Sequence, residues 1–251
     1  MTFTKMHGLG NDFVVFAGDE APTITPDLVQ RLCDRRTGIG ADGVIAVSVV
    51  ETDVVRMDYW NADGSEAEMC GNGMRCTARF AADRGWVGGP ELTIETRRGR
   101  LGARLLDDGR ISVELGPVDV ADWVEVHGRR LRTASVGNPH AVTEVDDVPG
   151  APVAVEGAAI GTDPTFPDGT NVGFMAVSDG AIELRVWERG VGETLACGSG
   201  AAAAAAVAIA GGKAVSPVVL TVPGGSFEVA FEDGVAWLTG PAETVFAGDL
   251  A

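Results

Sequence analysis

The sequence predicts an α+β fold of two pseudo-symmetric domains from an internal duplication, each a mixed or antiparallel sheet around a central helix. The first observation is a repeat: Cys70-Gly71 returns as Cys197-Gly198, 127 positions later (197 − 70), with several other residues at the same offset. The second is that each half contains many short Val- and Ile-rich segments and one principal helix candidate. A duplicated α+β unit accounts for both observations.

The repeat extends over most of the chain. Chance could produce any one matching dipeptide, but it is a poor explanation for seven positions at one offset. We therefore expect a first half at residues 1–118, which carries Cys70 and is joined by the tail 243–251, and a second half at residues 119–242, which carries Cys197. The matching pairs are Gly10-Asn11 and Gly137-Asn138, Trp60 and Trp187, Glu66 and Glu193, Cys70-Gly71 and Cys197-Gly198, and Gly73 and Gly200.

Three segments have the spacing of helices, namely Pro26–Arg35, Asn72–Asp83 and Gly198–Ala210. Strands are predicted where short runs rich in Val and Ile lie between Gly, Asp or Pro residues. Turn signals such as Asp108-Gly109 favour hairpins, and therefore largely antiparallel pairing. The predicted strands are 12–16, 43–50, 54–59, 92–96 and 111–115 in the first half, and 141–145, 172–177, 182–187, 218–222, 227–231 and 235–238 in the second.

The composition excludes several classes of protein. With 36 acidic and 19 basic side chains the net charge is −17, which repels nucleic acids and anionic membrane surfaces. The amino-terminal segment lacks the charged start and apolar run of a secretory signal, and the most apolar stretch, residues 201–210, is about half as long as a membrane span. We expect a soluble cytoplasmic protein whose four cysteines are free thiols.

Cys70 and Cys197 stand in the same local context, in which Trp and nine further residues precede Cys-Gly-x-Gly at the start of a predicted helix. Unpaired N–H groups and the positive end of the helix dipole favour a thiolate there, so we expect a lowered thiol pKa, and the same groups bind carboxylates. The glycines after each cysteine let a ligand approach the backbone. Two such turns can present one thiol to each face of a bound amino acid.

Inversion at a carbon needs a base on one face and an acid on the other. Two thiols supplied by a duplicated fold meet that need, and two helix N-termini would stabilise the charge that develops on the substrate carboxylate. Neither Lys5 nor Lys213 lies in a motif for a pyridoxal Schiff base, so no cofactor is expected. The chemistry indicated is cofactor-independent epimerisation of an amino acid.

Other interpretations of the cysteines explain less. Packing accounts for Cys33 and Cys76, but not for the repeated Trp, Glu and Gly-x-Gly frame around the other two. A zinc site would lack a Cys-x-x-Cys pair and would have only three histidines to draw on, so no metal is expected. Gly8-x-Gly10 lacks the third glycine of a dinucleotide-binding loop. A non-catalytic thiol redox or binding protein stays open, and the turnover of single cysteine variants distinguishes it.

The sequence resembles the diaminopimelate epimerase family over essentially its whole length. The longest matching motif is Trp-Asn-Ala-Asp-Gly-Ser-Glu-Ala-Glu-Met-Cys-Gly-Asn-Gly-Met-Arg-Cys at residues 60–76. The resemblance implies the fold of that family and a possible homodimer. It also implies interconversion of LL- and meso-2,6-diaminopimelate, a step toward lysine and peptidoglycan precursors. Further matching segments are residues 7–13, 38–43, 137–140, 169–172 and 188–200.

The resemblance also implies roles for residues of this sequence. Cys70 and Cys197 would be the acid/base pair, and their roles would exchange when the reaction reverses. The backbone amides of Gly71-Asn72 and of Gly198-Ser199 would hold the reacting carboxylate.

The remaining groups of the substrate would contact a second set of residues. Arg189 suits a distal carboxylate as a fork of donors, and Glu188 suits an ammonium group. His140 and Glu188 would also tune the thiol pKa values. The implied binding residues are Asn11, Asn61, Asn138, Asn171, Glu188 and Arg189.

Two positions depart from the family pattern. Gly43 stands where many members carry a substrate-contacting glutamine, so a contact there would come from the backbone or be absent, and Ser199 replaces a frequent threonine. A sister epimerase of the same fold, acting on histidine or proline-type substrates, is the alternative. Arg189 with Asn61 and Asn171 favours a substrate with a second charged end.

Overall fold

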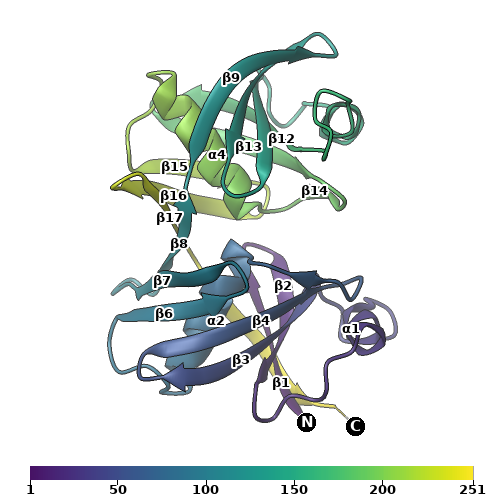
Figure 1. The fold of residues 1–251 in the computed structure, drawn as a ribbon, viewed down its shortest axis with the longest axis vertical. Helices are drawn as coiled ribbons and strands as arrows, with labels where there is room; N and C mark the ends of the chain where they lie inside the picture. The colour runs from purple at the N-terminus through teal and green to yellow at the C-terminus, as the bar shows by residue number, and fades with distance from the viewer. Residues whose placement is uncertain (251) are drawn as a thin grey trace. The chain divides into compact units, whose positions relative to one another are not determined.

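The computed structural model describes residues 1–250 of the chain. The chain forms two compact units (Figure 1): unit 1 consists of Met1–Glu114 and the segment that begins at Gly240, and unit 2 consists of Leu115–Thr239. The chain therefore passes from unit 1 into unit 2 and back again. That the units are separate domains with the boundaries expected from the sequence stays a prediction.

Unit 1 is built on one mixed sheet. Its strands are β1 (Thr2–Gly8), β2 (Asn11–Ala17), β3 (Gly43–Glu51), β4 (Val54–Asn61), β5 (Glu66–Ala67), β6 (Glu91–Thr96), β7 (Gly99–Leu105), β8 (Ile111–Pro117, which runs on into unit 2) and β18 (Glu243–Asp249). They lie in the order β18–β1–β2–β3–β4–β6–β7–β8, with β2–β3 and β4–β6 parallel and the other pairs antiparallel. The short β5 pairs with the end of β4.

Unit 2 repeats this sheet. Its strands are β9 (Asp119–Val126), β10 (Arg129–Ser135), β11 (Pro139–Glu144), β12 (Asn171–Ser178), β13 (Ala181–Glu188), β14 (Gly192–Thr194), β15 (Val218–Val222), β16 (Gly225–Glu232) and β17 (Val235–Gly240). The order is β9–β10–β11–β12–β13–β15–β16–β17, with β11–β12 and β13–β15 parallel and the other pairs antiparallel. Strand order and the sense of each pair thus match those of unit 1, so the predicted duplicated α+β fold is confirmed.

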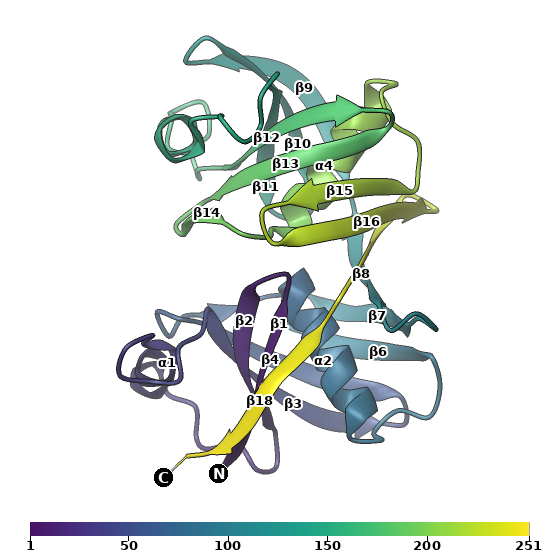
Figure 2. The same cartoon turned by 180° about the vertical axis from the view of Figure 1, so that it is seen from behind.

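One long helix packs against a face of each sheet (Figure 2). Helix α2 (Gly71–Asp83) does so in unit 1 with large side chains such as Met74 and Phe80, which are 0% and 3% exposed. Helix α4 (Gly198–Ala210) does so in unit 2 almost entirely with alanines, and the six residues Ala201–Ala206 are all buried. The same supersecondary unit is therefore filled in two ways, with large side chains in one helix and with close backbone approach in the other.

The opposite face of each sheet has a smaller cover. In unit 1 it is helix α1 (Pro26–Cys33), whose Val29 and Leu32 pack on Val14 and Phe16. In unit 2 it is a π-helical turn η1 (Val153–Gly157) followed by helix α3 (Ala158–Gly161). Each unit therefore has its sheet between one long helix on one face and a short helical segment on the other.

The helix predictions hold closely, with one correction at an end. Helix α1 stops at Cys33 instead of Arg35, because Asp34 has extended backbone and its Oδ1 accepts the N–H groups of Arg36 and Thr37. Helices α2 and α4 are each followed by a glycine with left-handed backbone, Gly85 and Gly212 respectively. The sequence did not predict η1 with α3, or strands β1, β5, β7, β9, β10, β14 and β18. No helix within residues 1–250 is long and apolar enough to cross a lipid bilayer.

Candidate active site

Cys70 and Cys197 are the N-cap residues of α2 and α4. Both have extended backbone, and each Sγ accepts the backbone N–H three residues further on, that of Gly73 or Gly200, at 3.4 Å. The sulfur thus occupies the place that a Ser or Asp oxygen takes in an ordinary N-cap. Because the first N–H groups of a helix have no acceptor within it, each cap places a thiol beside donors that suit a carboxylate.

In unit 1 the Cys70 sulfur lies beside an amide chain. Its Sγ donates to Asn11 Oδ1 at 3.6 Å, and the Asn72 amide donates to the same oxygen at 3.0 Å. The other end of Asn11 donates to Asp42 Oδ2 at 2.8 Å. The structure therefore brings together three of the predicted site residues, and Asp42 fixes the orientation of one of them.

Asn61 lies at the end of β4, opposite Gly43 on β3. Its side-chain amide donates to Ser65 Oγ at 3.1 Å. A Cβ at Gly43 would lie 2.5 Å from both Tyr59 Cε2 and the Trp60 carbonyl oxygen. No side chain fits at residue 43 with this packing, so only backbone is available to a ligand there.

In unit 2 the corresponding residues make different contacts. Asn138 presents its amide nitrogen to Ser199 Oγ at 3.4 Å and its oxygen to His140 Nε2 at 3.2 Å. Ser199 Oγ is also 3.6 Å from Cys197 Sγ. The asparagine near Cys197 therefore faces the helix start as a donor, whereas Asn11 faces Cys70 as an acceptor.

Asn171 and Arg189 form a brace in unit 2. Asn171 donates to the Pro139 carbonyl at 2.8 Å and accepts the backbone N–H of Arg189 at 2.9 Å. The exposed Arg189 side chain donates to the Asp168 carbonyl at 2.6 Å. Both ends of the Asn171 amide are thus engaged with backbone, and they hold the turn that carries Arg189.

The expected lowering of the thiol pKa is wrong for Cys197. Burial, followed by the charge of the Glu188 carboxylate, raises the pKa of this thiol well above its ordinary value. The hydrogen bonds from Ser199 and Gly200 lower the pKa, but by less than burial and Glu188 raise it. The helix N-terminus stabilises the thiolate by less than burial destabilises it. In this environment Cys197 holds its proton at neutral pH.

His140 is buried, at 2% exposed, and burial together with the charge of Arg189 lowers its pKa to about 3. Its ring nitrogen contacts Asn138. Glu188 accepts a hydrogen bond from the Thr194 hydroxyl. Of the two residues expected to tune the thiols, Glu188 acts on Cys197 electrostatically, and His140 is a neutral imidazole that orients Asn138.

The other two cysteines are buried, as the packing interpretation expects. Burial raises the pKa of Cys33 to about 11 and that of Cys76 to about 12. None of the four cysteines, all within residues 1–250, forms a disulfide. Within residues 1–250 no three His, Cys, Asp or Glu side chains are grouped so that they could hold a metal ion.

Arg75 is completely buried in α2 and was not predicted as a residue of this site. Its Nη2 donates to Asn72 Oδ1 at 2.9 Å and its Nε to the Pro241 carbonyl at 3.1 Å. The only signal was a charged residue on the face of α2 that also carries apolar side chains.

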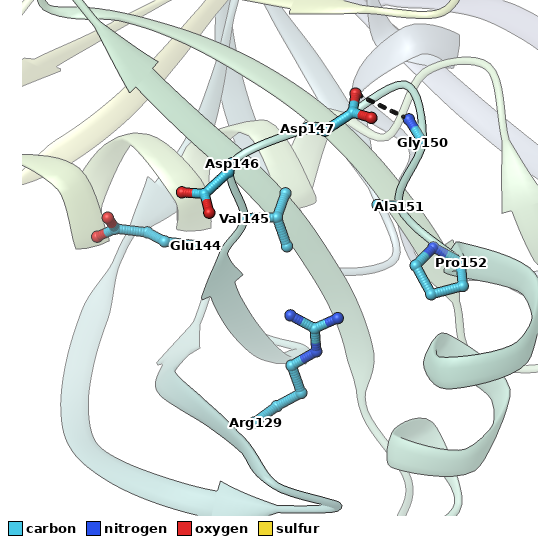
Figure 3. Close-up of a pocket in the computed structure, with 8 residues that line it drawn as sticks. All are labelled: Arg129, Glu144, Val145, Asp146, Asp147, Gly150, Ala151 and Pro152. Atoms are coloured by element: carbon cyan, nitrogen blue, oxygen red, sulfur yellow. Dashed lines mark hydrogen bonds between the residues drawn. The ribbon is translucent and has the colours of Figure 1, made fainter.

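A hollow of about 300 Å³ lies in unit 2 (Figure 3), and none of the predicted site residues is among the residues that line it, such as Arg129, Asp146 and Asp147.

Comparison with known proteins decides the family. The family model for diaminopimelate epimerase matches residues 3–121 and 132–245. The chain belongs to the diaminopimelate epimerase family. A diaminopimelate epimerase from Azoarcus sp. (strain BH72) is 44% identical over 270 residues, which cover 99% of this chain and 98% of the relative. One from Moorella thermoacetica is 42% identical over 277 residues, which cover 100% of this chain and 99% of the relative.

Solved structures show the same fold at low identity. A phenazine biosynthesis protein of the PhzF family from Bacillus anthracis has a TM-score of 0.77 at 15% identity and covers 100% of this chain and 99% of its own. A hydroxyproline epimerase from Agrobacterium vitis has a TM-score of 0.72 at 16% identity and covers 99% and 91%. These likenesses concern the fold alone. Membership of the diaminopimelate epimerase family makes the chain an isomerase, and the histidine or proline alternative is not favoured.

Proposed function

We propose that this enzyme interconverts LL- and meso-2,6-diaminopimelate by proton transfer at one α-carbon, with Cys70 and Cys197 as the acid/base pair. The observation that carries the proposal is that both cysteines are N-caps with the same sulfur–amide contact at 3.4 Å, in a family whose relatives are named for this substrate. Two like thiols at like helix starts suit a reaction that removes a proton and returns one.

The chemistry balances with these groups alone. One cysteine, as thiolate, takes the α-proton and becomes a thiol, while the other, as thiol, gives its proton to the opposite face and becomes a thiolate. Charge that develops on the α-carboxylate would be stabilised by the backbone N–H groups at Gly71-Asn72 and Gly198-Ser199, in the first turns of the two helices. The state of Cys197, whose proton is held by burial and by Glu188, suits the acid in the first turnover.

Substrate recognition is proposed for the residues around the two caps. Arg189, exposed and held by the Asn171 brace, would bind a carboxylate, and Glu188 an ammonium group. Asn11, Asn61 and Asn138 would contact the remaining polar groups. The homodimer, the cytoplasmic location, and the place of the reaction in lysine and peptidoglycan precursor synthesis are likewise proposals that follow from family membership.

Single cysteine variants test the proposal. Cys70→Ala and Cys197→Ala should each lower epimerisation by about 10³-fold, within the range of about 10²–10⁴ for loss of one acid or base. The measurement is incorporation of solvent deuterium at the α-carbon of diaminopimelate, followed by NMR. Cys33→Ala, a buried cysteine in α1, serves as the matched control and should retain activity.

Proline and histidine are assayed in parallel and should take up no label. Label that enters histidine or proline but not diaminopimelate would contradict the substrate. Full turnover in either single variant would contradict the acid/base pair and favour a thiol protein of another kind.

A further inference from the structure

Arg189 is an exposed arginine of unit 2 that has no carboxylate partner within residues 1–250. Two other arginines of the same unit are paired, Arg129 with Glu156 and Arg185 with Glu193, both at 2.7 Å. Acidic side chains outnumber basic ones by 36 to 19 in this chain, so carboxylates are plentiful. Arg189 is thus a cation that suits a carboxylate from outside the chain.

The exposed side chain of Arg189 is nevertheless held at both ends. At one end its backbone N–H donates to Asn171 Oδ1 at 2.9 Å, and Asn171 is buried, at 5% exposed. At the other end its Nη1 donates to the Asp168 carbonyl at 2.6 Å. A guanidinium has further N–H donors beside the one used here, and they stay available to a ligand.

Between these two ends the methylene groups of Arg189 lie against Gly169. A Cβ at Gly169 would lie 3.0 Å from Arg189 Cδ and 3.4 Å from its Cγ, closer than the ordinary contact between two carbon atoms. The same Cβ would lie 3.1 Å from the Gly161 carbonyl oxygen, which accepts the N–H of Thr170 at 3.0 Å. Because backbone gives way less easily than a side chain, an added methyl group would displace the arginine.

Unit 1 lacks this arrangement. Strand β4 is followed by Ala62, as β13 is followed by Arg189. The Ala62 N–H donates to the backbone carbonyl of Asp42 at 3.0 Å, whereas the Arg189 N–H donates to the side chain of Asn171. The hold on Arg189 is therefore an addition to the repeated sheet and not a part of it.

We propose that Gly169 is a positioning residue for recognition of the substrate: it leaves room for the Arg189 methylene groups, so that the guanidinium stands ready for the second carboxylate of a diamino dicarboxylic acid. This inference rests on the proposed function. An exposed arginine loses rotamer freedom when it binds a ligand, and that loss weakens binding. Asn171, Gly169 and the Asp168 carbonyl fix Arg189 beforehand, so the substrate binds a side chain that is already ordered.

The test compares two glycines of unit 2 that have like backbones and unlike neighbours. Gly169 and Gly180 have φ of 70° and 77°, and a Cβ at Gly180 would meet nothing within 4 Å. Gly180 precedes β13, whereas Arg189 follows that strand. Gly169→Ala therefore adds left-handed strain and a contact with Arg189, and the matched control Gly180→Ala adds the strain alone.

The measurement is kcat and KM for diaminopimelate, from uptake of solvent deuterium at the α-carbon. Gly169→Ala should raise KM by about tenfold with kcat little changed, because a displaced binding group weakens substrate and transition state alike. Gly180→Ala should leave both constants as in the wild type. Arg189→Ala should raise KM by about a hundredfold, the order expected for loss of hydrogen bonds to a charged group.

A double variant decides whether Gly169 acts through Arg189. In the Arg189→Ala background the methylene groups that meet residue 169 are gone, so Gly169→Ala should raise KM no further. A Gly169→Ala enzyme with the KM of Gly180→Ala would overturn the proposal. An effect of Gly169→Ala that keeps its full size in the double variant would overturn it as well.

Should Gly169→Ala not fold, Gly169→Asn carries the same Cβ, and asparagine adopts left-handed backbone more readily than alanine. Gly180→Asn is then the control, and the same results decide. A wild type that fails to exchange diaminopimelate would instead overturn the proposed function.

Discussion

Helices α2 and α4 have matching backbone at both ends and different side chains between those ends. Both helices start at a cysteine N-cap, and both end with two backbone hydrogen bonds. The N–H groups of Gly85 and Trp86 donate to the carbonyls of Ala82 and Ala81. Those of Gly212 and Lys213 donate to the carbonyls of Ile209 and Ala208. Between these matched ends, α2 carries a buried arginine and large apolar side chains, whereas α4 carries alanines. The two units thus share the caps, which set where each sulfur lies, and differ in the side chains that pack behind them.

The largest effect should come from the helix that packs with large side chains. Phe80 in α2 is 3% exposed and meets Trp86 edge to face, so Phe80→Ala should cost about 3–5 kcal/mol of unfolding free energy. In α4 the damaging change runs the other way. Ala204→Leu should cost about 1–3 kcal/mol by overpacking, and urea denaturation measures both. An unfolding free energy of Ala204→Leu equal to that of the wild type would show that α4 does not need its close approach to the sheet.

A middle-sized effect should appear as a loss of stability between pH 7 and pH 5 that comes from His140 of unit 2. His140 has a pKa of about 3 in the fold against an ordinary value of 6.5, and the corresponding residue of unit 1 is Phe13 (140 − 127). As pH falls below about 6.5 the unfolded chain gains a proton that the folded chain refuses, so stability decreases toward acid. This loss continues until the pH approaches the folded value of about 3.

His140→Gln removes that contribution. Between pH 7 and pH 5 the variant should lose about 2 kcal/mol less unfolding free energy than the wild type, as measured by urea denaturation at the two pH values. His127→Gln, at a half-exposed position beside Asp163, is the matched control. The interpretation fails if the variant and the wild type lose the same amount.

The smallest effect should be equal in the two units. Gly85 and Gly212 have φ of 67° and 69°, and a Cβ at either would meet nothing within 4 Å. Each Gly→Ala change should therefore cost about 1–2 kcal/mol from left-handed backbone alone, by the same denaturation measurement. A clear difference between the two variants would mean that the helix ends are less alike than their backbones.

Much of the fold was predictable because the repeat and the helix ends have local signals. The Cys-Gly starts and glycine stops define α2 and α4 almost to the residue. Strand β9 was missed because most of its residues are exposed and acidic residues interrupt its apolar ones. Strand β18 was missed because it pairs with β1 from the far end of the chain, as in Thr2 opposite Asp249. No pattern within a short window reveals that pairing.

The site was predictable in its sulfur atoms and less so in their electrostatics. The pKa of Cys197 is raised, although its place at a helix start predicts a lowered value, because burial outweighs the helix end. Burial depends on the tertiary fold and is not visible in the local sequence. Arg75 was missed because a charged residue within a helix is ordinarily exposed. Its burial is made possible by two acceptors within unit 1, the Asn72 side-chain oxygen and the Pro241 carbonyl.

The return of the chain to unit 1 sets an order on biosynthesis. Strand β18 and the Pro241 carbonyl are translated after the whole of unit 2, yet they supply the edge beside β1 and an acceptor for Arg75. A growing polypeptide therefore carries β1 with an open hydrogen-bonding edge throughout that interval, a state that invites pairing with foreign strands. The half of the molecule that leaves the ribosome first is thus the one that matures last.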